Sequence, residues 1–425
     1  MKPSPWTEAD TQRLLTLLRI DTVTPMETGR LCDFGLAQAE VAAMAAEVGF
    51  EVLACEPAPS SVLDDPVAPV PLRERARMLG PSFFATQPNL VLRLGAGPHD
   101  RTLMFNVHLD TVSGEVPVAC EAGRITGRGA ADAKGLGVAV IVGIRRALAI
   151  DSSLPRRICI LFQSVVGEEG GAMGIYGTRH LVQRGYHGRL NVVCEPTSST
   201  AFDRTTASMT VRIAVDGVGA TDDAPERGHN ATILLGYLAS TLARELAPQV
   251  SEAGGKMCIA GLATGDMHNR VYGTGVLLLN FAYPSLEVGL AIEDLAETAF
   301  RAGLDGFVRD LAASPIARWT ARAAHDICRL TWLKRRLPVL ANRDAAMEAL
   351  LREARIPRHD ERSSATPFTC DAMWLAGPDR YAMVLGPGDL GANQAHAPGE
   401  FMEVAALDEF ADQVARLVLA FGRQA

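Results

Sequence analysis

Histidine and carboxylate side chains follow several apolar segments of this sequence, at the points where those segments end. His108 and Asp110 close the run "TLMFNVHLD", Glu168 and Glu169 follow "RRICILFQSVVG", and Glu195 follows "LNVVC". Continuous apolar runs of this kind predict strands that are buried on both faces of a sheet. Because sites in open α/β sheets form at the carboxyl ends of the strands, these side chains could meet at one edge.

Two further motifs contain residues of the same types. Asp132 lies in the glycine-rich stretch "GRGAADAKG", and His396 lies in "NQAHAPGEF". Two imidazoles and several carboxylates form a ligand set that suits zinc or a similar divalent ion. Two such ions could share a bridging carboxylate and activate a bridging water. Each signal alone has an ordinary structural explanation, so the hypothesis of a metal site depends on their conjunction.

The glycine-rich stretch has one competing interpretation, which is a phosphate-binding loop. Such loops end in Gly-Lys followed by Ser or Thr, where the lysine and the hydroxyl contact phosphate and magnesium. "GRGAADAKG" lacks that ending. We therefore favour a metal ligand at Asp132 over a phosphate loop.

The order of the predicted elements indicates an α/β catalytic domain with a mixed, mostly parallel sheet flanked by helices. Strands and helices alternate over the first 200 residues and again near the end of the chain, which is typical of such sheets. Residues 7–20 predict an amphipathic helix capped by Thr7, and 36–48 and 131–150 predict two more helices. Residues 57–82 are proline-rich and predict a loop or an excursion of the chain.

The pattern changes near residue 204, where strands begin to alternate between apolar and polar residues. Asn230 precedes an amphipathic helix as a good cap, and residues 317–333 predict a final strand. We expect an inserted α+β lid or dimerisation domain at 204–332, with a four-stranded antiparallel sheet and two helices. The metal-binding catalytic domain then comprises 1–203 and 333–425.

Composition excludes several classes of protein. The net charge is −8 and no basic tract is visible, which disfavours nucleic acid as a partner. No run approaches the length of about 18 apolar residues that a membrane-spanning helix needs, and the first residues contain no apolar signal-peptide core. The eight cysteines are scattered singly and no CxxC motif occurs. We expect reduced thiols in a cytoplasmic protein.

Taken in order, the motifs resemble those of one family of enzymes. The segments "HLDTV", "GRGAADAKG", "GEEGG", "EPT", "PERGHNA", "GPGD" and "AHAPGE" are similar to those of the di-zinc aminoacylases and peptidases. That family includes acetylornithine deacetylase, succinyl-diaminopimelate desuccinylase and glutamate carboxypeptidase. The resemblance covers nearly the whole chain, and it implies hydrolysis of an amide bond in an N-acyl amino acid or small peptide.

The resemblance also implies a role for individual residues. One metal would be held by His108, Asp132 and Glu195, and the other by Asp132, Glu169 and His396. The metals would be zinc, with cobalt and manganese as alternatives. Asp110 would hydrogen-bond the second nitrogen of His108, and Glu168 would be the general base that passes a proton from water to the leaving amine. Gly386, Gly388 and Asn269 would contact substrate.

Two positions depart from the family pattern. Thr221 stands where the family usually has a histidine that supports the oxyanion, and Ala282 stands where it usually has an arginine that binds a substrate carboxylate. Arginine binds a carboxylate through two charge-assisted hydrogen bonds, and loss of an oxyanion donor typically costs about 100- to 1,000-fold in rate. These departures predict an atypical substrate site.

Three interpretations of these departures remain. The enzyme could hydrolyse an unusual substrate, with Asp222 and Asp223 facing a cationic group. His229 or His268 could replace the missing histidine, although a histidine at a helix start is commonly just solvated. The site could instead perform acyl transfer or cyclisation in specialised biosynthesis, or only bind a ligand. By analogy with the family, we expect a homodimer formed through the inserted domain.

Overall fold

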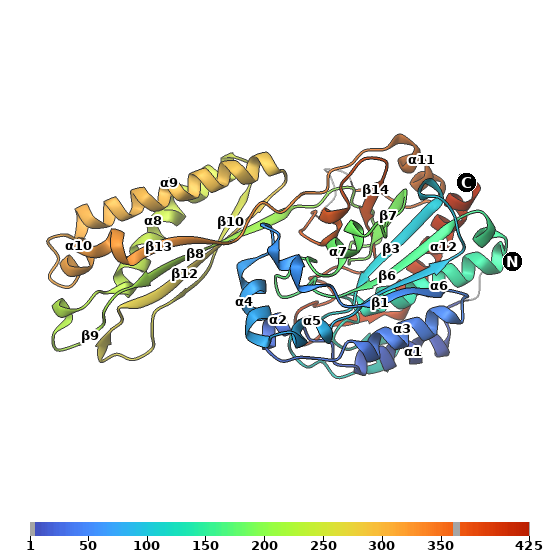
Figure 1. The fold of residues 1–425 in the computed structure, drawn as a ribbon, viewed down its shortest axis with the longest axis horizontal. Helices are drawn as coiled ribbons and strands as arrows, with labels where there is room; N and C mark the ends of the chain where they lie inside the picture. Colours follow the sequence, from blue (N-terminus) through green and yellow to red (C-terminus); the bar gives the residue numbers. More distant parts are fainter. Residues whose placement is uncertain (1–4, 360–365, 425) are drawn as a thin grey trace. The chain divides into compact units, whose positions relative to one another are not determined.

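The computed structural model describes residues 5–359 and 366–424, and they divide into two compact units. Unit 1 contains the chain up to Thr205 and from Leu340 onward, and unit 2 contains Thr206–Val339. Each unit has its own sheet and its own helices (Figure 1). Unit 2 is therefore inserted into the chain of unit 1.

Described residues of unit 1 form a mixed six-stranded sheet. Its strand order is β1 (Glu51–Glu56), β2 (Asn89–Leu94), β6 (Cys159–Val165), β3 (Thr102–His108), β7 (Leu190–Val193), β14 (Tyr381–Val384). The pairs β1–β2 and β2–β6 are antiparallel, and the other three pairs are parallel. β3, β6 and β7 are buried over their whole length because both faces of the sheet are covered. The predicted α/β fold with a mostly parallel sheet is confirmed.

Helices cover both faces of this sheet. The described helices of unit 1, whether or not they pack on the sheet, are α1 (Glu8–Arg19), α2 (Pro25–Thr28), α3 (Gly35–Ala46), α4 (Val70–Leu79), α5 (Ser82–Ala85), α6 (Lys134–Ile150), α7 (Thr178–Gln183), α11 (Ala345–Glu353), α12 (Val404–Gln424) and the 3₁₀ helices η1 (Ser60–Asp64), η2 (His99–Arg101), η3 (Leu154–Arg156), η5 (Asp371–Leu375). Apolar side chains of α1, α3, α6 and α12 share one cluster with β2, β3 and β6. Residues of α7 and η5 pack in a second cluster, against β3, β6, β7 and β14. A small sheet joins β15 (Phe401–Glu403), β5 (Arg124–Thr126) and β4 (Ala119–Glu121).

Two local predictions in unit 1 had different outcomes. The Thr7 cap is confirmed, since its side chain accepts a hydrogen bond from the Asp10 amide and Asp10 bonds back to the Thr7 amide. The prediction of a loop over 57–82 is wrong, because this segment contains η1, α4 and the start of α5. Pro71 lies in the first turn of α4, where a missing N–H costs no hydrogen bond. The prolines therefore begin this helix and do not prevent it.

The described part of unit 2 consists of a four-stranded antiparallel sheet, helices and a second sheet of two short strands. The sheet order is β10 (Lys256–Ala263), β12 (Thr274–Tyr283), β8 (Ala207–Asp216), β13 (Cys328–Lys334). The helices are α8 (Ala231–Glu252), α9 (Leu286–Leu311), α10 (Arg318–Ile327) and η4 (Pro225–Arg227). The small second sheet pairs β9 (Ala220–Thr221) with β11 (Arg270–Val271) in antiparallel orientation. The predicted Asn230 cap is confirmed, because its side chain accepts a hydrogen bond from the Ile233 amide.

The predicted strand over 317–333 is wrong in its first part. Residues Arg318–Ile327 form α10, and β13 begins only at Cys328. Thr320, Ala321 and Ala324 are the buried residues of α10, which is the three- and four-residue spacing of one helix face. The apolar residues near the end of the segment favoured a strand and concealed this spacing.

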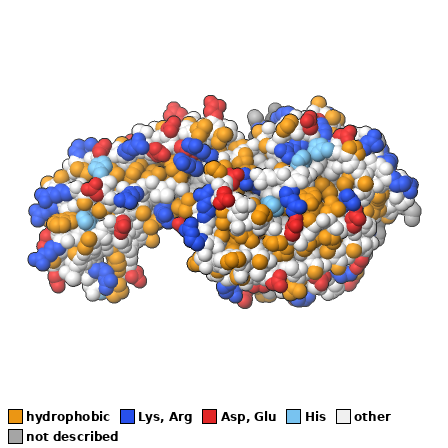
Figure 2. Space-filling model, viewed as in Figure 1, with side chains coloured by type: hydrophobic (Ala, Val, Ile, Leu, Met, Phe, Trp, Pro, Cys, Tyr) orange, Lys and Arg blue, Asp and Glu red, His pale blue; other side chains and the backbone are white. Residues whose placement is uncertain are grey.

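Two features of the described residues concern the charges on the surface and the polarity of the helices. Acidic and basic side chains are interspersed over the visible face of both units (Figure 2). Within residues 5–359 and 366–424, no helix combines the length and the low polarity that crossing a bilayer requires.

Candidate metal centre

Three neighbouring parallel strands position the acidic and imidazole side chains at one edge of the sheet of unit 1. His108 is the last residue of β3, Glu168 and Glu169 follow β6, and Glu195 follows β7. β3 lies between β6 and β7 and pairs with both in parallel. The carboxyl ends of the three strands therefore meet, as the sequence predicted.

Two loops bring Asp132 and His396 to the same place. Asp132 precedes α6, and its Oδ1 lies 2.8 Å from His108 Nε2. Its other oxygen, Oδ2, lies 3.0 Å from His396 Nε2. His396 Nε2 is also 3.0 Å from Glu169 Oε1, and His108 Nε2 is 3.8 Å from Glu195 Oε1. Asp132 thus lies between two imidazoles and presents a different oxygen to each.

The contact of the second nitrogen of His108 fixes the tautomer of the neutral ring. His108 Nδ1 lies 2.9 Å from the carbonyl oxygen of Asp110. A carbonyl can only accept, so Nδ1 carries the proton, and in the neutral ring Nε2 has a free lone pair. The resemblance implied that the Asp110 carboxylate would accept this bond. In the structure that carboxylate is 3.9 Å from Nδ1 and accepts from the amides of Glu168, at 3.4 Å, and Glu169, at 2.9 Å.

Burial and mutual repulsion control the charges of these side chains. Burial, together with the charges of neighbouring carboxylates, raises the pKa of Glu168 well above its ordinary value. Burial also raises the pKa of Glu195, although His108 opposes the shift. Burial alone would raise the pKa of Asp132, but its hydrogen bonds with His108 and His396 outweigh burial and lower it. Hydrogen bonds to Asp132 and Glu169 raise the pKa of His396 to about 10.

The donor set fits two divalent cations. His108, Asp132 and Glu195 place one ligand atom each within 4.8 Å of one another, and so do Asp132, Glu169 and His396. Among the described residues, no lysine or arginine forms an ion pair with Asp132, Glu168, Glu169 or Glu195. Two imidazoles face four carboxylates, so part of the negative charge has no basic partner, and buried charge of this kind is costly unless a metal compensates it. The chemistry of the donors is that of a zinc-type site.

Gly386 and Gly388 lie in the turn after β14 and pack against the loop that follows Glu195. A Cβ atom at Gly386 would meet the Glu195 carbonyl oxygen at 2.5 Å. Gly386 also accepts from the amides of Thr197 and Ser199, and Gly388 accepts from that of Ser198. Gly388 has a φ of 72°, which favours glycine. In this structure both glycines hold the Glu195 loop, and contact with substrate stays a prediction.

The remaining candidate substrate residues belong to unit 2, whereas all the candidate metal ligands belong to unit 1. Thr221 of β9 pairs with Arg270 of β11, so this small sheet brings the segment of Asp222 and Asp223 close to that of His268 and Asn269, and all four residues are exposed. His229 accepts a hydrogen bond at Nδ1 from the Val218 amide. Ala282 is half-buried in β12 and pairs with Lys256. These roles stay predictions.

Sequence reasoning missed three polar residues near the centre. Glu400 and Arg128 lie within the quoted motifs "AHAPGE" and "GRGAADAKG", so opposite charges in two ligand-bearing motifs were an available signal. Asp371 gave no such signal. It is buried at the start of η5 and accepts a hydrogen bond from Thr178 Oγ1. Burial raises the pKa of Asp371 to about 7, although the hydrogen bond from Thr178 and the charge of His108 oppose the shift.

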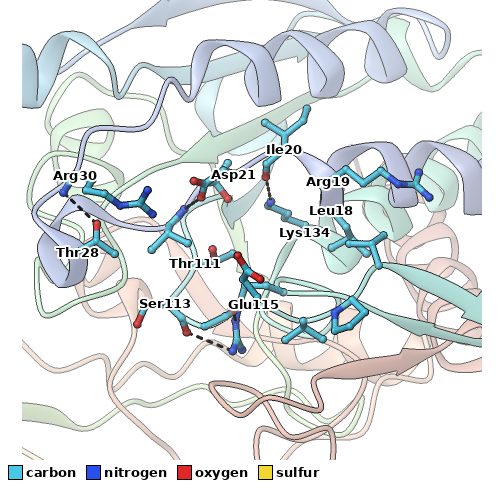
Figure 3. Close-up of a pocket in the computed structure, with 17 residues that line it drawn as sticks. Leu18, Arg19, Ile20, Asp21, Thr28, Arg30, Thr111, Ser113, Glu115 and Lys134 are labelled. Carbon is cyan, nitrogen blue, oxygen red and sulfur yellow. Dashed lines mark hydrogen bonds between the residues drawn. The ribbon is translucent and has the colours of Figure 1, made fainter.

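A cavity of about 630 Å³ lies beside α1, and none of the candidate metal ligands is among the residues that line it. At its wall Lys134 Nζ donates to the carbonyl oxygen of Ile20, at 2.9 Å (Figure 3). It also donates to the carbonyl oxygen of Leu17, at 3.2 Å. Burial lowers the pKa of Lys134 to about 7. Lys134 therefore satisfies carbonyl groups at the C-terminal end of α1, which is a structural role.

Comparison with known proteins gives relatives in sequence. A LysW-lysine/LysW-ornithine hydrolase from Aeropyrum pernix is 32% identical over 198 residues, which are 46% of this chain and 52% of the relative. A succinyl-diaminopimelate desuccinylase from Gluconacetobacter diazotrophicus is 29% identical over 231 residues, 49% of this chain and 58% of the relative. The alignments therefore span little more than half the length of these curated relatives.

Solved structures share the fold at low sequence identity. A tripeptidase from Staphylococcus aureus superimposes with a TM-score of 0.67 at 16% identity, over 99% of this chain and 100% of the other. A metallo-carboxypeptidase from Sulfolobus solfataricus has the same TM-score at 12% identity, over 98% and 100% of the two chains. The model of peptidase family M20/M25/M40 matches residues 104–420, which include all five candidate metal ligands. The chain therefore belongs to peptidase family M20/M25/M40.

Proposed function

We propose that this protein is a hydrolase that depends on two divalent metal ions and cleaves an amide bond of an N-acyl amino acid or small peptide. The observation that carries the proposal is the position of Asp132, whose two carboxylate oxygens face two different histidines. Membership of a peptidase family supports the reaction class. The two relatives, named as a hydrolase of lysine and ornithine conjugates and as a desuccinylase, support an amide made by an amino acid.

Each residue has a distinct task in this proposal. His108, Asp132 and Glu195 would hold one cation, and Asp132, Glu169 and His396 the other, with zinc preferred and cobalt or manganese as alternatives. Bound cations would polarise the amide carbonyl and lower the pKa of a water molecule. Glu168 takes the proton of the attacking water and passes it to the leaving amine. The Asp110 carboxylate holds the Glu168 amide and so orients this base.

We further propose a cytoplasmic homodimer. Eight free cysteines support a reducing compartment. The exposed edge strand β10 beside α8 in unit 2 supports association of two copies.

The test combines metal analysis with a substrate panel. We expect about two zinc ions per chain, removal of activity by a chelator, and hydrolysis of some N-acyl amino acids, dipeptides or amides without a carboxylate. Glu168→Gln should lower kcat about 100- to 10,000-fold, because an amide cannot accept the proton, and should keep its metal. The exposed Glu74 in α4 gives the matched control Glu74→Gln, which should keep full activity.

The outcomes separate the alternatives. A wild-type protein that binds no divalent metal and hydrolyses nothing in the panel would contradict the proposal. Formation of a transferred or cyclised amide in place of the free acid would favour the non-hydrolytic reaction. Thr221 and Ala282 are the reason to consider it, because they replace the histidine and the arginine that the hydrolases usually have.

A further inference from the structure

We propose that Glu400 is a positioning residue that, together with Arg128, fixes the position of Asp132 relative to the segment that carries His396. This inference rests on the proposed function. Glu400 is completely buried. Its Oε1 accepts from the backbone amides of Gly129 at 3.0 Å, Ala131 at 3.0 Å and Asp132 at 3.2 Å. Its carboxylate thus fills the concave side of the glycine-rich loop, where a phosphate would bind in a phosphate loop.

Arg128 extends this contact to the segment that carries His396. Its Nη1 donates to Glu400 Oε2 at 2.7 Å, and its Nη2 donates to the carbonyl oxygen of Ala397 at 3.2 Å. The same guanidinium donates to the carbonyl oxygens of Ser113 and Gly114, in the segment that follows Asp110. One buried ion pair therefore joins three segments, and each of them carries a residue of the candidate centre.

The small sheet explains why the two residues meet. β15 begins immediately after Glu400, and β5 ends shortly before Arg128. The two strands are antiparallel, with Phe401 opposite Thr126. This register places Glu400 against the glycine-rich loop. The ion pair and the strand pairing therefore fix the same relative position of two segments that lie far apart in the sequence.

The charge of Glu400 matters as well as its shape. An ionised carboxylate is an acceptor at both oxygens, so it can satisfy three amides and a guanidinium together. A glutamine side chain has only one acceptor oxygen, and its NH₂ group would face a donor. Because one of the three amides belongs to Asp132, loss of this bond moves the residue shared by both cation sites. Partners that orient metal ligands typically change metal affinity or activity about 10- to 100-fold when mutated.

The experiment uses full-length protein loaded with Co²⁺ as a spectroscopic probe. We expect Glu400→Gln to weaken Co²⁺ binding about 10- to 100-fold in competition with a chelator and to change the visible absorption of the bound ion. We expect kcat to fall while KM changes little, because the bridging ligand is displaced and the substrate contacts are not. Glu400→Asp, which keeps the charge, should recover part of the affinity and of the spectrum.

A matched control separates positioning from general stability. Glu293 in α9 is also buried and also pairs with arginines, Arg335 and Arg336, but it lies in unit 2. Glu293→Gln should lower the melting temperature and leave the Co²⁺ spectrum unchanged. Should Glu400→Gln not fold, Arg128→Lys carries the same expectation, because lysine keeps the charge and cannot reach all four acceptors.

Two failures can be told apart. A wild-type protein that binds no Co²⁺ or Zn²⁺ contradicts the proposed function itself. A wild-type protein that binds two ions, beside a folded Glu400→Gln or Arg128→Lys variant with wild-type affinity and spectrum, leaves the proposed function intact and overturns the role of Glu400.

Discussion

Asp110 uses two chemically different groups to order the candidate centre. Its carbonyl oxygen sets the tautomer of His108, and its carboxylate accepts from the amides of Glu168 and Glu169. The first interaction is made by the main chain, so it does not depend on which side chain residue 110 has. Only the second depends on the aspartate side chain, so a substitution at this position tests the placement of the Glu168–Glu169 pair alone.

We predict that Asp110→Asn lowers kcat about 10- to 100-fold, the range typical of residues that support metal ligands. The asparagine keeps the main-chain bond to His108, but it loses the negative charge that accepts hydrogen bonds from the amides of Glu168 and Glu169. Steady-state kinetics and metal content measure the effect. Asp203→Asn is the control, since Asp203 is also buried but pairs with Arg358 and Arg343 away from the centre. That control should lose stability and keep kcat, and an equally active Asp110→Asn would contradict the prediction.

For some single residues the sequence predicts a place in the candidate centre, and for others it does not. His108 and Glu195 could be placed near each other because strand ends converge in a parallel sheet. The bridging role of Asp132 came from the resemblance, since nothing in a glycine-rich stretch fixes how its side chains point to the strand ends. For Glu400 the only signal was the opposite charge of Arg128 in another motif. Its other side-chain partners are main-chain amides, which every residue except proline has. Asp371 reaches the centre through tertiary packing, which leaves no mark in the local sequence.

At the scale of the elements, the predictions succeeded where one pattern dominated a segment. Residues 7–20 combine a cap, an acidic first turn and an apolar face, and all three indicate the same helix. Residues 317–333 contain a helix followed directly by a strand, and no glycine or proline marks the change at Cys328. The helix α4 was missed because its prolines precede and begin it.

The contact between α6 and α12 gives an element-scale prediction. A Cβ atom at Gly143 of α6 would lie 2.6 Å from both the Ala411 carbonyl oxygen and Val414 Cβ of α12. Gly143→Ala should therefore destabilise unit 1, with a cost of about 1–3 kcal/mol that is typical of overpacking. Differential scanning calorimetry would detect it as a lower melting temperature.

Helix α8 supplies the matched control for that substitution. Gly236 is also a glycine inside a helix, but no atom lies within 4 Å of a Cβ built there. Gly236→Ala should be neutral or stabilise unit 2 by up to about 1 kcal/mol, through the higher helix propensity of alanine. Equal effects of the two substitutions would mean that helix propensity, and not the contact with α12, decides the outcome at Gly143.

At the scale of the whole molecule, association of two copies would give the edge strand β10 a partner. β10 lies at one end of the sheet of unit 2, beside α8, and its Ile259 and Leu262 are 37% and 43% exposed. An unpaired edge strand with apolar side chains favours pairing with another chain. Because less than half of each side chain is still exposed, its burial contributes about 1 kcal/mol, in addition to the hydrogen bonds of the strand.

We predict that Ile259→Lys with Leu262→Lys converts a homodimer into monomers of 45.3 kDa, because lysines on an edge strand disfavour pairing. Light scattering coupled to size-exclusion chromatography measures the mass, and circular dichroism checks the fold. Val218→Lys is the control, since Val218 is 68% exposed in unit 2 but lies outside β10, and this variant should stay dimeric. A monomeric wild-type protein would contradict the dimer itself. If the variant with both lysines stays dimeric, β10 is not part of the dimer interface, and the interface lies on another surface.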